Sequence, residues 1–525
     1  MCASSRRILG SFPPVSTGGD FPLPGRHPAR RAADQRPGCI VAETFSWPQE
    51  HLLNCSLPAP GLFLLSLTNP CAQRSTASRR TLESSQKSWE ENINHWQSKT
   101  IYSPMLFCIT TLPPPVLLST LLLQHSIPTG ADHAKSKGSA RVKAYYPTYN
   151  HVGQPPSKID WDAYTDVLFF MVIPEANFTL SFDPVLTPSQ GEDLVTEFVA
   201  QARKHDVNPV LSTGGWTGSR HFSNLTATSS SRERFAQVLV QFAKKHGFHG
   251  IEIDWEYPNS DGIGCNSRNK NDVVNFGLFT KELRTLWPEI ELTAAVTLEG
   301  LVGSDGKSAT KHETALLSEN LDFVNLMAYD VYGPWSDTTG PLAPLLATCA
   351  PASAAQSVET GLQVALKQGF KASQVLLGIP GYANRFQLIS PELVPKTVDK
   401  QITLYYQNKT KVTPRGGRFD DKPGHDVCGQ PQAWGGSFLV RELVRRGWLS
   451  KDQKHGLNGY TRYFDECSGE PFLTNGKYLI SYDDEDSTIA KAKFAKEKNM
   501  GGIYFFDTMG PTKNTLSEAR KIFSE

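Results

Sequence analysis

The sequence has no excess of charge of either sign, because 53 Lys and Arg residues stand against 52 Asp and Glu residues in a chain of 525. No net field therefore draws the protein toward nucleic acid or an anionic lipid surface. We expect no nucleic-acid partner and an uncharged ligand. Cysteine pairs with Cys-x-x-Cys spacing are also missing, which argues against a zinc site.

The first hundred or so residues lack a sustained apolar period and are rich in Arg, Ser and Pro. This composition predicts a disordered extension, or a doubtful translation start, over residues 1–104. An apolar run then begins at Met105 and is followed by small or polar residues, so 105–134 is similar to a secretory signal. We expect Met105 to be the working start and the protein to be extracellular. A signal anchor is the alternative, although consecutive prolines interrupt the run.

Four of the nine cysteines follow this segment, which fits export to an oxidising compartment. They are Cys265, Cys349, Cys428 and Cys467. Four cysteines allow three pairings. We favour Cys265 with Cys349, in loops after two predicted strands, and Cys428 with Cys467, which would brace one insertion. Glycosylation sequons, which are compatible with the same route, begin at Asn177, Asn224 and Asn408.

From residue 141 onward, short β-rich apolar runs alternate with amphipathic helical patterns, which predicts a parallel sheet in an α/β fold. The expected strands are 142–147, 166–173, 208–216 (a strand that runs into a glycine turn), the acidic stretch 250–258, 291–297, 323–330, 375–380 and 501–507. Eight strands with helices between them predict one TIM (β/α)8 barrel over residues 138–525. About ninety residues separate strands seven and eight, too many for structureless chain, so we expect a small folded insertion near 384–475.

The acidic stretch is the main candidate for chemistry. In a strand, alternate side chains share a face, so Glu252, Asp254 and Glu256 project together while apolar residues line the other side. Crowded carboxylates cannot all stay ionised, and a retained proton is what a general acid needs. A solvated surface strand is the alternative. The apolar opposite face and the loop that follows disfavour it, because barrels place their chemistry at the carboxyl ends of strands.

This stretch resembles the Asp-Gly-x-Asp-x-Asp-x-Glu signature of glycoside hydrolase family 18, the chitinases and chitinase-like lectins. His249 and Glu252 stand where the family has its first two Asp residues, whereas Asp254 and Glu256 are retained. The resemblance extends over residues 138–525. Further stretches similar to family motifs are Ser212–Gly215 (Ser-x-Gly-Gly), Met327–Asp330 (Met-x-Tyr-Asp) and Gly381-Tyr382 (Pro-Phe-Tyr-Gly), and Phe506 stands where members usually have Trp.

The resemblance implies an α+β insertion that forms one wall of a deep cleft, and a mechanism in which the substrate's own acetamido group attacks. It implies that Glu256 donates the proton, Asp254 accepts a hydrogen bond from the acetamido N–H, and Tyr329 orients the acetamido oxygen. Glu252 would hold the proton of Asp254. No metal or organic cofactor is required.

The implied ligand is chitin or a chitooligosaccharide, bound by a monomer that needs no protein partner. Aromatic rings can stack on the flat C–H faces of sugars, although each ring could equally serve packing. The candidate binding residues are Tyr146, Gly215, Trp216, Met327, Asp330, Trp335, Tyr382 and Phe506.

Three activities remain open. Retention of Glu256 favours an enzyme that hydrolyses β-1,4-linked N-acetylglucosamine. A weak or inactive chitinase-like lectin is the second, because Glu252 is one methylene longer than Asp and Phe506 lacks the indole N–H. An endo-β-N-acetylglucosaminidase acting on N-glycans is the third, since it uses the same core.

Overall fold

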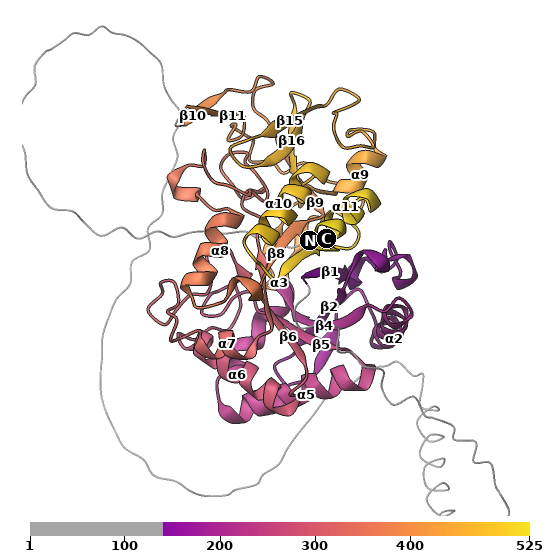
Figure 1. Ribbon diagram of the computed structural model, residues 1–525, viewed down its shortest axis with the longest axis vertical. Coiled ribbons are helices and arrows are strands. Elements are labelled where there is room, and N and C mark those ends of the chain that lie inside the picture. The colour runs from indigo at the N-terminus through magenta and orange to yellow at the C-terminus, as the bar shows by residue number, and fades with distance from the viewer. Residues whose placement is uncertain (1–139, 399, 525) are drawn as a thin grey trace, which may run out of the picture. The chain divides into compact units, whose positions relative to one another are not determined.

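The computed structural model describes residues 140–398 and 400–524, and eight parallel strands in it close into a barrel (Figure 1). The strands are β1 (Arg141–Pro147), β2 (Asp166–Pro174), β4 (Asn208–Gly214), β5 (Gly250–Asp254), β6 (Glu291–Thr297), β7 (Phe323–Met327), β8 (Val375–Pro380) and β18 (Gly502–Phe506). Pairing of β1 with both β18 and β2 completes the ring, and a short β3 (Leu180–Phe182) joins β2 antiparallel. The predicted TIM barrel is confirmed.

Two predicted strands, β5 and β7, end earlier than expected, and β4 runs into its predicted glycine turn. β5 ends at Asp254, so Glu256 lies on the segment after the strand. β4 ends at Gly214, where the backbone turns into the short helix α3 (Gly215–Gly218). β7 ends at Met327, and Asp330 has a positive φ of 59°, which no strand residue adopts. All three strand ends lie at the carboxyl edge of the barrel.

Helices surround the barrel and cover the outer faces of its strands (Figure 1). They are α2 (Pro188–Lys204), α4 (Phe222–Thr226), α5 (Ser229–His246), α6 (Asp272–Leu286), α7 (Ala315–Asn320), α8 (Val358–Lys367), α10 (Glu485–Glu497) and α11 (Lys513–Ser524). Local sequence sets their ends. Thr187 and Thr228 cap α2 and α5 through capping boxes, and Gly247, with φ 77°, ends α5 as its position predicts.

Strand alternation divides the barrel into two apolar regions. Outward residues such as Ile251 and Ile253 pack against the helices in the larger core. Inward residues such as Tyr145, Tyr504 and Phe506 form a smaller aromatic cluster inside the barrel. This inner cluster forms the floor beneath the carboxyl edge.

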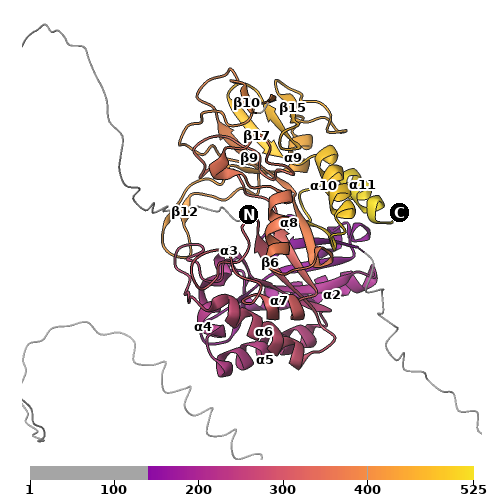
Figure 2. The ribbon, with the colours of Figure 1, turned by 60° about the vertical axis from the view of Figure 1, so that its left-hand side comes forward.

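The insertion between β8 and α10 is a five-stranded antiparallel sheet with one helix, seen above the barrel in Figure 2. Its sheet has the order β14-β9-β17-β16-β15, from β14 (Ser437–Leu439), β9 (Tyr382–Gln387), β17 (Tyr478–Tyr482), β16 (Glu470–Thr474) and β15 (Thr461–Asp465). The helix is α9 (Val440–Arg445), and two hairpins pair β10 (Lys396–Val398) with β11 (Gln401–Thr403) and β12 (Gly424–His425) with β13 (Pro431–Gln432). The insertion thus spans slightly more than the expected 384–475.

Buried polar contacts tie the insertion to the barrel. The Glu470 carboxylate is 0% exposed and accepts hydrogen bonds from the backbone N–H groups of Leu342 (2.9 Å) and Ala343 (2.7 Å), in the segment after β7. At the return to the barrel, buried Lys491 of α10 pairs with Asp483. Since these groups are shielded from water, the two parts are held in one arrangement.

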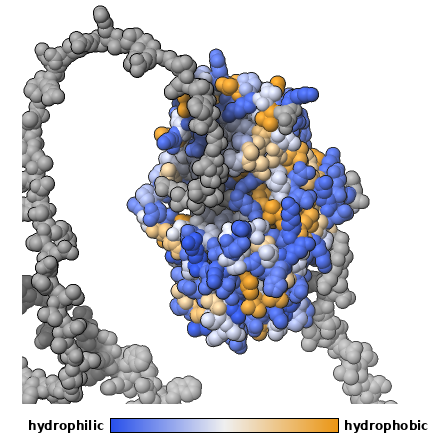
Figure 3. Space-filling view, turned by 90° about the vertical axis from the view of Figure 1, so that its left-hand side faces the viewer, coloured by the Kyte–Doolittle hydropathy of each residue, from blue (hydrophilic) through white to orange (hydrophobic). Residues whose placement is uncertain are grey.

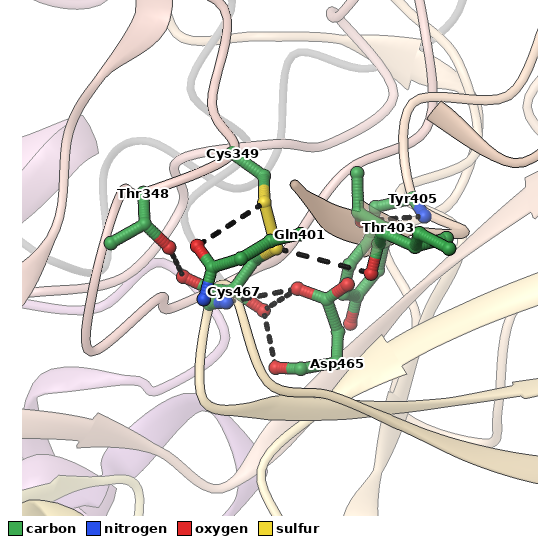
Figure 4. The surroundings of a disulfide bond; sticks show 9 residues. Thr348, Cys349, Gln401, Thr403, Tyr405, Asp465 and Cys467 are labelled. Carbon is green, nitrogen blue, oxygen red and sulfur yellow. Dashed lines mark hydrogen bonds between the residues drawn. A yellow bond between two sulfur atoms is a disulfide. The ribbon is translucent and has the colours of Figure 1, made fainter. Parts of the chain in front are cut away.

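The disulfide pairing that we favoured is wrong. Cys265 bonds to Cys428 and Cys349 bonds to Cys467, with Cα atoms 5.7 and 5.4 Å apart. Each bond joins a barrel loop to the insertion: Cys265 follows β5 and Cys428 lies in the β12–β13 turn, which reaches back to the barrel. Cys349 follows β7 and meets the β15–β16 turn, where Thr348 Oγ1 also donates to the Cys467 carbonyl (Figure 4).

The face of the molecule seen in Figure 3 is mostly hydrophilic, with apolar residues in separate patches. Several large apolar side chains on the insertion are exposed, among them Ile389, Val394 and Ile402. Among the described residues, no helix is long and apolar enough to cross a membrane. The predicted extension at 1–104 and the signal-like segment at 105–134 lie outside the described residues.

Candidate active site

A pocket with an empty volume of about 680 Å³, counting its open mouth, lies at the carboxyl edge of the barrel. Its lining comes from the ends of β5, β6, β7 and β18 and from the start of the insertion. The lining residues are Tyr145, Asp254, Glu256, Tyr257, Thr297, Leu298, Met327, Tyr329, Asp330, Gln356, Tyr382 and Phe506. Asp254, Glu256 and Tyr329, which the sequence places on two different strands, therefore face one space.

Glu252 lies beneath this pocket and is 0% exposed. Because β4 and β5 pair Ser212 with Glu252 in register, the Ser212 hydroxyl lies 2.5 Å from Glu252 Oε2, and Tyr145 Oη lies 3.1 Å from Oε1. Asn325 Nδ2 donates in turn to Tyr145 (2.9 Å). Burial raises the pKa of Glu252 to about 8, although the hydrogen bonds from Ser212 and Tyr145 oppose the rise. Glu252 thus retains a proton near neutral pH.

Asp254 is next along the inward face of β5 and is 4% exposed. Burial, followed by the charge of Glu252, raises the pKa of Asp254 well above its usual range. The structure gives Glu252 hydrogen bonds from Tyr145 and Ser212, whereas Asp254 Oδ1 has no hydrogen-bond partner among the described residues. A buried acceptor without a partner, in a pocket wall, is available to an N–H group of a ligand.

The backbone that carries Glu256 is fixed by two side chains. Glu256 N–H donates to Ser219 Oγ (2.9 Å), and Asn266 Nδ2 donates to the Glu256 carbonyl (2.7 Å). Ser219 and Asn266 are themselves buried. The Glu256 side chain, 4% exposed, is thereby held in the pocket wall beyond the end of β5. Neither Ser219 nor Asn266 is a site residue that sequence reasoning identified, because no motif marks them.

The opposite wall contains four more of the predicted site residues: Met327, Asp330, Tyr382 and Phe506. Tyr382 Oη donates to Asp330 Oδ1 (2.7 Å), which joins the insertion's first strand to the segment after β7. Phe506 packs edge-on against Tyr382 and at a tilt against Tyr329. The Phe506 ring thus forms an apolar part of the pocket between two tyrosines.

Tyr146, expected to stack on a sugar, points the other way. It is fully buried among the outer helices, where it stacks on Phe198 and donates to the Gln154 carbonyl (3.1 Å). Its neighbour Tyr145 is the residue of β1 that lines the pocket. Lys143 and Tyr145 share the inward face of β1, and strand parity puts Tyr146 on the opposite face.

Gly215, Trp216 and Trp335 also lie outside the pocket lining. A Cβ atom at Gly215 would come within 2.8 Å of Phe170 and Met171, so the residue faces protein. Trp216 is buried and packs edge-on against Tyr257. Trp335 is half-buried, and its ring covers Gly333. None of the three is among the residues that line this pocket, and sugar contacts from Trp216 and Trp335 stay a prediction.

The lining contains residues that no motif marked, notably Thr297, Leu298 and Gln356. Gln356 Nε2 donates to Glu299 Oε1 (2.6 Å), so the segment before α8 is fixed against the end of β6. Among residues 140–398 and 400–524, no group of His, Cys, Asp and Glu has the geometry of a metal site. The three sequon asparagines, at 177, 224 and 408, are all exposed.

The chain is similar in sequence and fold to known proteins. A "chitinase-like effector" of Moniliophthora roreri is 34% identical over 415 residues, covering 78% of this chain and 98% of the relative. A chitinase of Rhizomucor miehei, solved as a crystal structure, matches with 25% identity and a TM-score of 0.62, covering 73% of this chain and 100% of that one.

A chitinase of Cycas revoluta in complex with (GlcNAc)3 shares the fold at 22% identity, with a TM-score of 0.55 and coverage of 73% and 99%. Neighbours of this architecture therefore bind chitooligosaccharides. The family model described as glycosyl hydrolases family 18 matches residues 141–510. The chain belongs to glycosyl hydrolase family 18.

Proposed function

We propose that the protein hydrolyses β-1,4-linked N-acetylglucosamine in chitin and its oligomers, with the substrate's acetamido group as nucleophile. The observation that carries the proposal is that Asp254, Glu256 and Tyr329 line one pocket at the carboxyl edge of the barrel. A buried carboxyl, a second carboxyl and a phenol then surround the place where a sugar would lie.

In the first step Glu256 gives its proton to the glycosidic oxygen, and the bond from that oxygen to the anomeric carbon breaks. The acetamido oxygen forms the new bond to the anomeric carbon, which yields an oxazolinium ion and frees the leaving sugar. Asp254 Oδ1 accepts the hydrogen bond of the acetamido N–H and offsets the positive charge. Tyr329 donates to the acetamido oxygen and so orients it.

In the second step the Glu256 carboxylate removes a proton from water, which attacks the anomeric carbon and opens the oxazolinium ring. Because both steps invert that carbon, the product keeps the β configuration. Glu256 ends protonated, ready for the next cycle. Glu252 stays beneath Asp254, and its retained proton limits the negative charge in the buried floor.

The test is hydrolysis of a fluorogenic chitooligosaccharide by wild type and by Glu256→Gln, which keeps the shape and loses the acid. We expect the variant to lose about 10²- to 10⁴-fold in kcat. Binding of an unlabelled oligomer should persist. Equal rates for the two proteins would overturn the role of Glu256.

A chitinase-like lectin is the second candidate. It is favoured by the "chitinase-like effector" name of a relative and by Glu252 and Phe506, which depart from the family's usual Asp and Trp. If the protein is a lectin, the wild type will bind the oligomer and will not hydrolyse it. The assay above therefore separates the two.

We further propose that the protein acts outside the cell. Two disulfides suit an oxidising compartment, and the sequon asparagines are accessible. Amino-terminal sequencing of protein recovered from culture medium should find a start near residues 125–138. Peptides from residues 1–100 in the secreted protein would contradict this.

A further inference from the structure

Tyr504 is a buried tyrosine behind Tyr329, on the inward face of β18. Its side chain is 0% exposed and lies outside the pocket lining, whereas Tyr329 is part of that lining. The two hydroxyl oxygens are 3.1 Å apart, and the rings meet edge to face at 78°. Tyr504 thus reaches the pocket through the Tyr329 hydroxyl.

The barrel makes room for the Tyr504 hydroxyl at Gly378. Pairing of β18 with β8 puts Tyr504 beside Gly378. A Cβ atom at Gly378 would lie 2.6 Å from the Tyr504 hydroxyl oxygen and 2.7 Å from the adjoining ring carbon. A larger residue at 378 would displace the hydroxyl, so the glycine and the tyrosine fit each other.

The number of protons that the two hydroxyl groups carry indicates which of Tyr504 and Tyr329 donates the hydrogen bond. A phenol has one proton to donate and lone pairs that accept. Burial raises the pKa of both Tyr504 and Tyr329 well above the usual range, so both stay protonated. If Tyr329 donated to Tyr504, the proton of Tyr504 would be buried without an acceptor among the described residues, which is costly. The favoured arrangement has Tyr504 donate to Tyr329.

We infer that Tyr504 is a positioning residue: it holds Tyr329 as a hydrogen-bond donor toward the pocket and so selects a sugar that presents an acceptor there. The inference rests on the proposed function, in which that acceptor is the acetamido carbonyl oxygen. A glucosamine unit carries an ammonium group instead, which has donors and no acceptor. Tyr504 therefore contributes to discrimination between N-acetylated and deacetylated chains.

The experiment measures the affinities of (GlcNAc)4 and (GlcN)4 by calorimetry in the Glu256→Gln background, which binds the oligomer with little turnover, without and with Tyr504→Phe, which removes only the hydroxyl. We expect (GlcNAc)4 affinity to fall about three- to tenfold, the range of one hydrogen bond, and (GlcN)4 affinity to stay the same. Adding Tyr504→Phe to Tyr329→Phe should cause no further loss. If Tyr504→Phe folds poorly, Tyr504→Met fills the same space with a flexible apolar chain and should give the same loss of selectivity.

The matched control is Tyr405→Phe. Tyr405 is also fully buried and donates its hydroxyl hydrogen bond to the Pro471 carbonyl (2.9 Å), but within the insertion. We expect Tyr405→Phe to lower the stability of the protein and to leave the affinities for (GlcNAc)4 and (GlcN)4 unchanged.

Three results would overturn the inference: unchanged selectivity in Tyr504→Phe, an equal loss for both oligomers, or a loss that adds fully to that of Tyr329→Phe. Failure of the proposed hydrolysis is distinguishable from these. A wild type that binds (GlcNAc)4 with the expected double-mutant pattern yet cuts nothing would support the role of Tyr504 and contradict the enzyme.

Discussion

Glu252 and Asp254 are consecutive inward residues of β5, and both are buried with raised pKa values. Burial disfavours the charged form of each carboxyl, and each charge disfavours the other. Two adjacent carboxyl groups in a dry floor therefore keep at least one proton between them at a pH at which exposed carboxyl groups would have lost both. The raised pKa values follow from burying two carboxyl groups side by side at one pocket.

A consequence at Glu252 is that stability depends on pH. Its pKa rises from 4.5 in the unfolded chain to about 8 in the fold, so between these values the folded state binds more protons. The stabilisation that the protonated Glu252 carboxyl gives to the folded state is fully present below pH 4.5 and is lost as the pH rises through 8. We expect the melting temperature of wild type to fall between pH 5 and 8, and to fall less in Glu252→Gln. Calorimetry at several pH values measures both, and parallel curves would contradict the raised pKa.

Site residues could be predicted from the sequence where charge and spacing mark them. The prediction failed where the direction of a side chain decides whether it reaches the pocket. The acidic stretch predicted that Asp254 and Glu256 face the same space, and both line the pocket, although Glu256 lies beyond the end of β5. Tyr145 and Tyr146 are adjacent aromatics, and only the direction of β1 decides which faces the pocket. The positions of Ser219 and Asn266 depend on loops that meet in space, which no local pattern records.

At the scale of elements, the turn after β4 depends on glycine. Gly214 has φ 108°, and a Cβ atom there would lie 2.2 Å from the Asp254 carbonyl oxygen. The chain carrying Asp254 can approach this turn because no side chain intervenes. The family motif Ser-x-Gly-Gly thus supports the acidic strand in two ways, through the Ser212 hydroxyl and through this close approach.

We therefore expect Gly214→Ala to destabilise the protein by at least about 1–2 kcal/mol, the cost of a left-handed conformation, with the clash added. Activity should fall because Asp254 is displaced. Gly424→Ala is the control, since a Cβ atom at Gly424 meets nothing within 4 Å. Urea unfolding of both variants measures the difference, and equal stabilities would show that the turn tolerates a side chain.

The disulfides join loops that are far apart in sequence, with separations of 163 and 118 residues. Peptide mapping without reduction should recover Cys265 linked to Cys428 and Cys349 linked to Cys467. Replacing Cys265 and Cys428 together by Ser should lower the free energy of unfolding by about 2–4 kcal/mol, because the unfolded chain gains freedom. The corresponding double replacement of Cys349 and Cys467 is the comparison. Recovery of Cys265 linked to Cys349 would contradict the arrangement of the insertion.

For the whole molecule, the repeating strand and helix pattern was enough to predict a barrel and the place of an insertion. The strands are buried apolar runs whose order follows the chain, so local pattern and overall fold agree. The disulfide pairing could not be predicted in the same way. It depends on how the β12–β13 turn and the β15–β16 turn reach back from the insertion to the barrel, and sequence spacing does not contain that geometry.

The central claim is that the pocket formed by Asp254, Glu256 and Tyr329 cleaves its sugar with help from the sugar's own acetamido group. Proton NMR of (GlcNAc)4 within the first minutes of digestion tests it most directly, because the new reducing end is seen before it equilibrates. We expect the β-anomer to appear first. Initial release of the α-anomer, or no release of shorter oligomers at all, would contradict it.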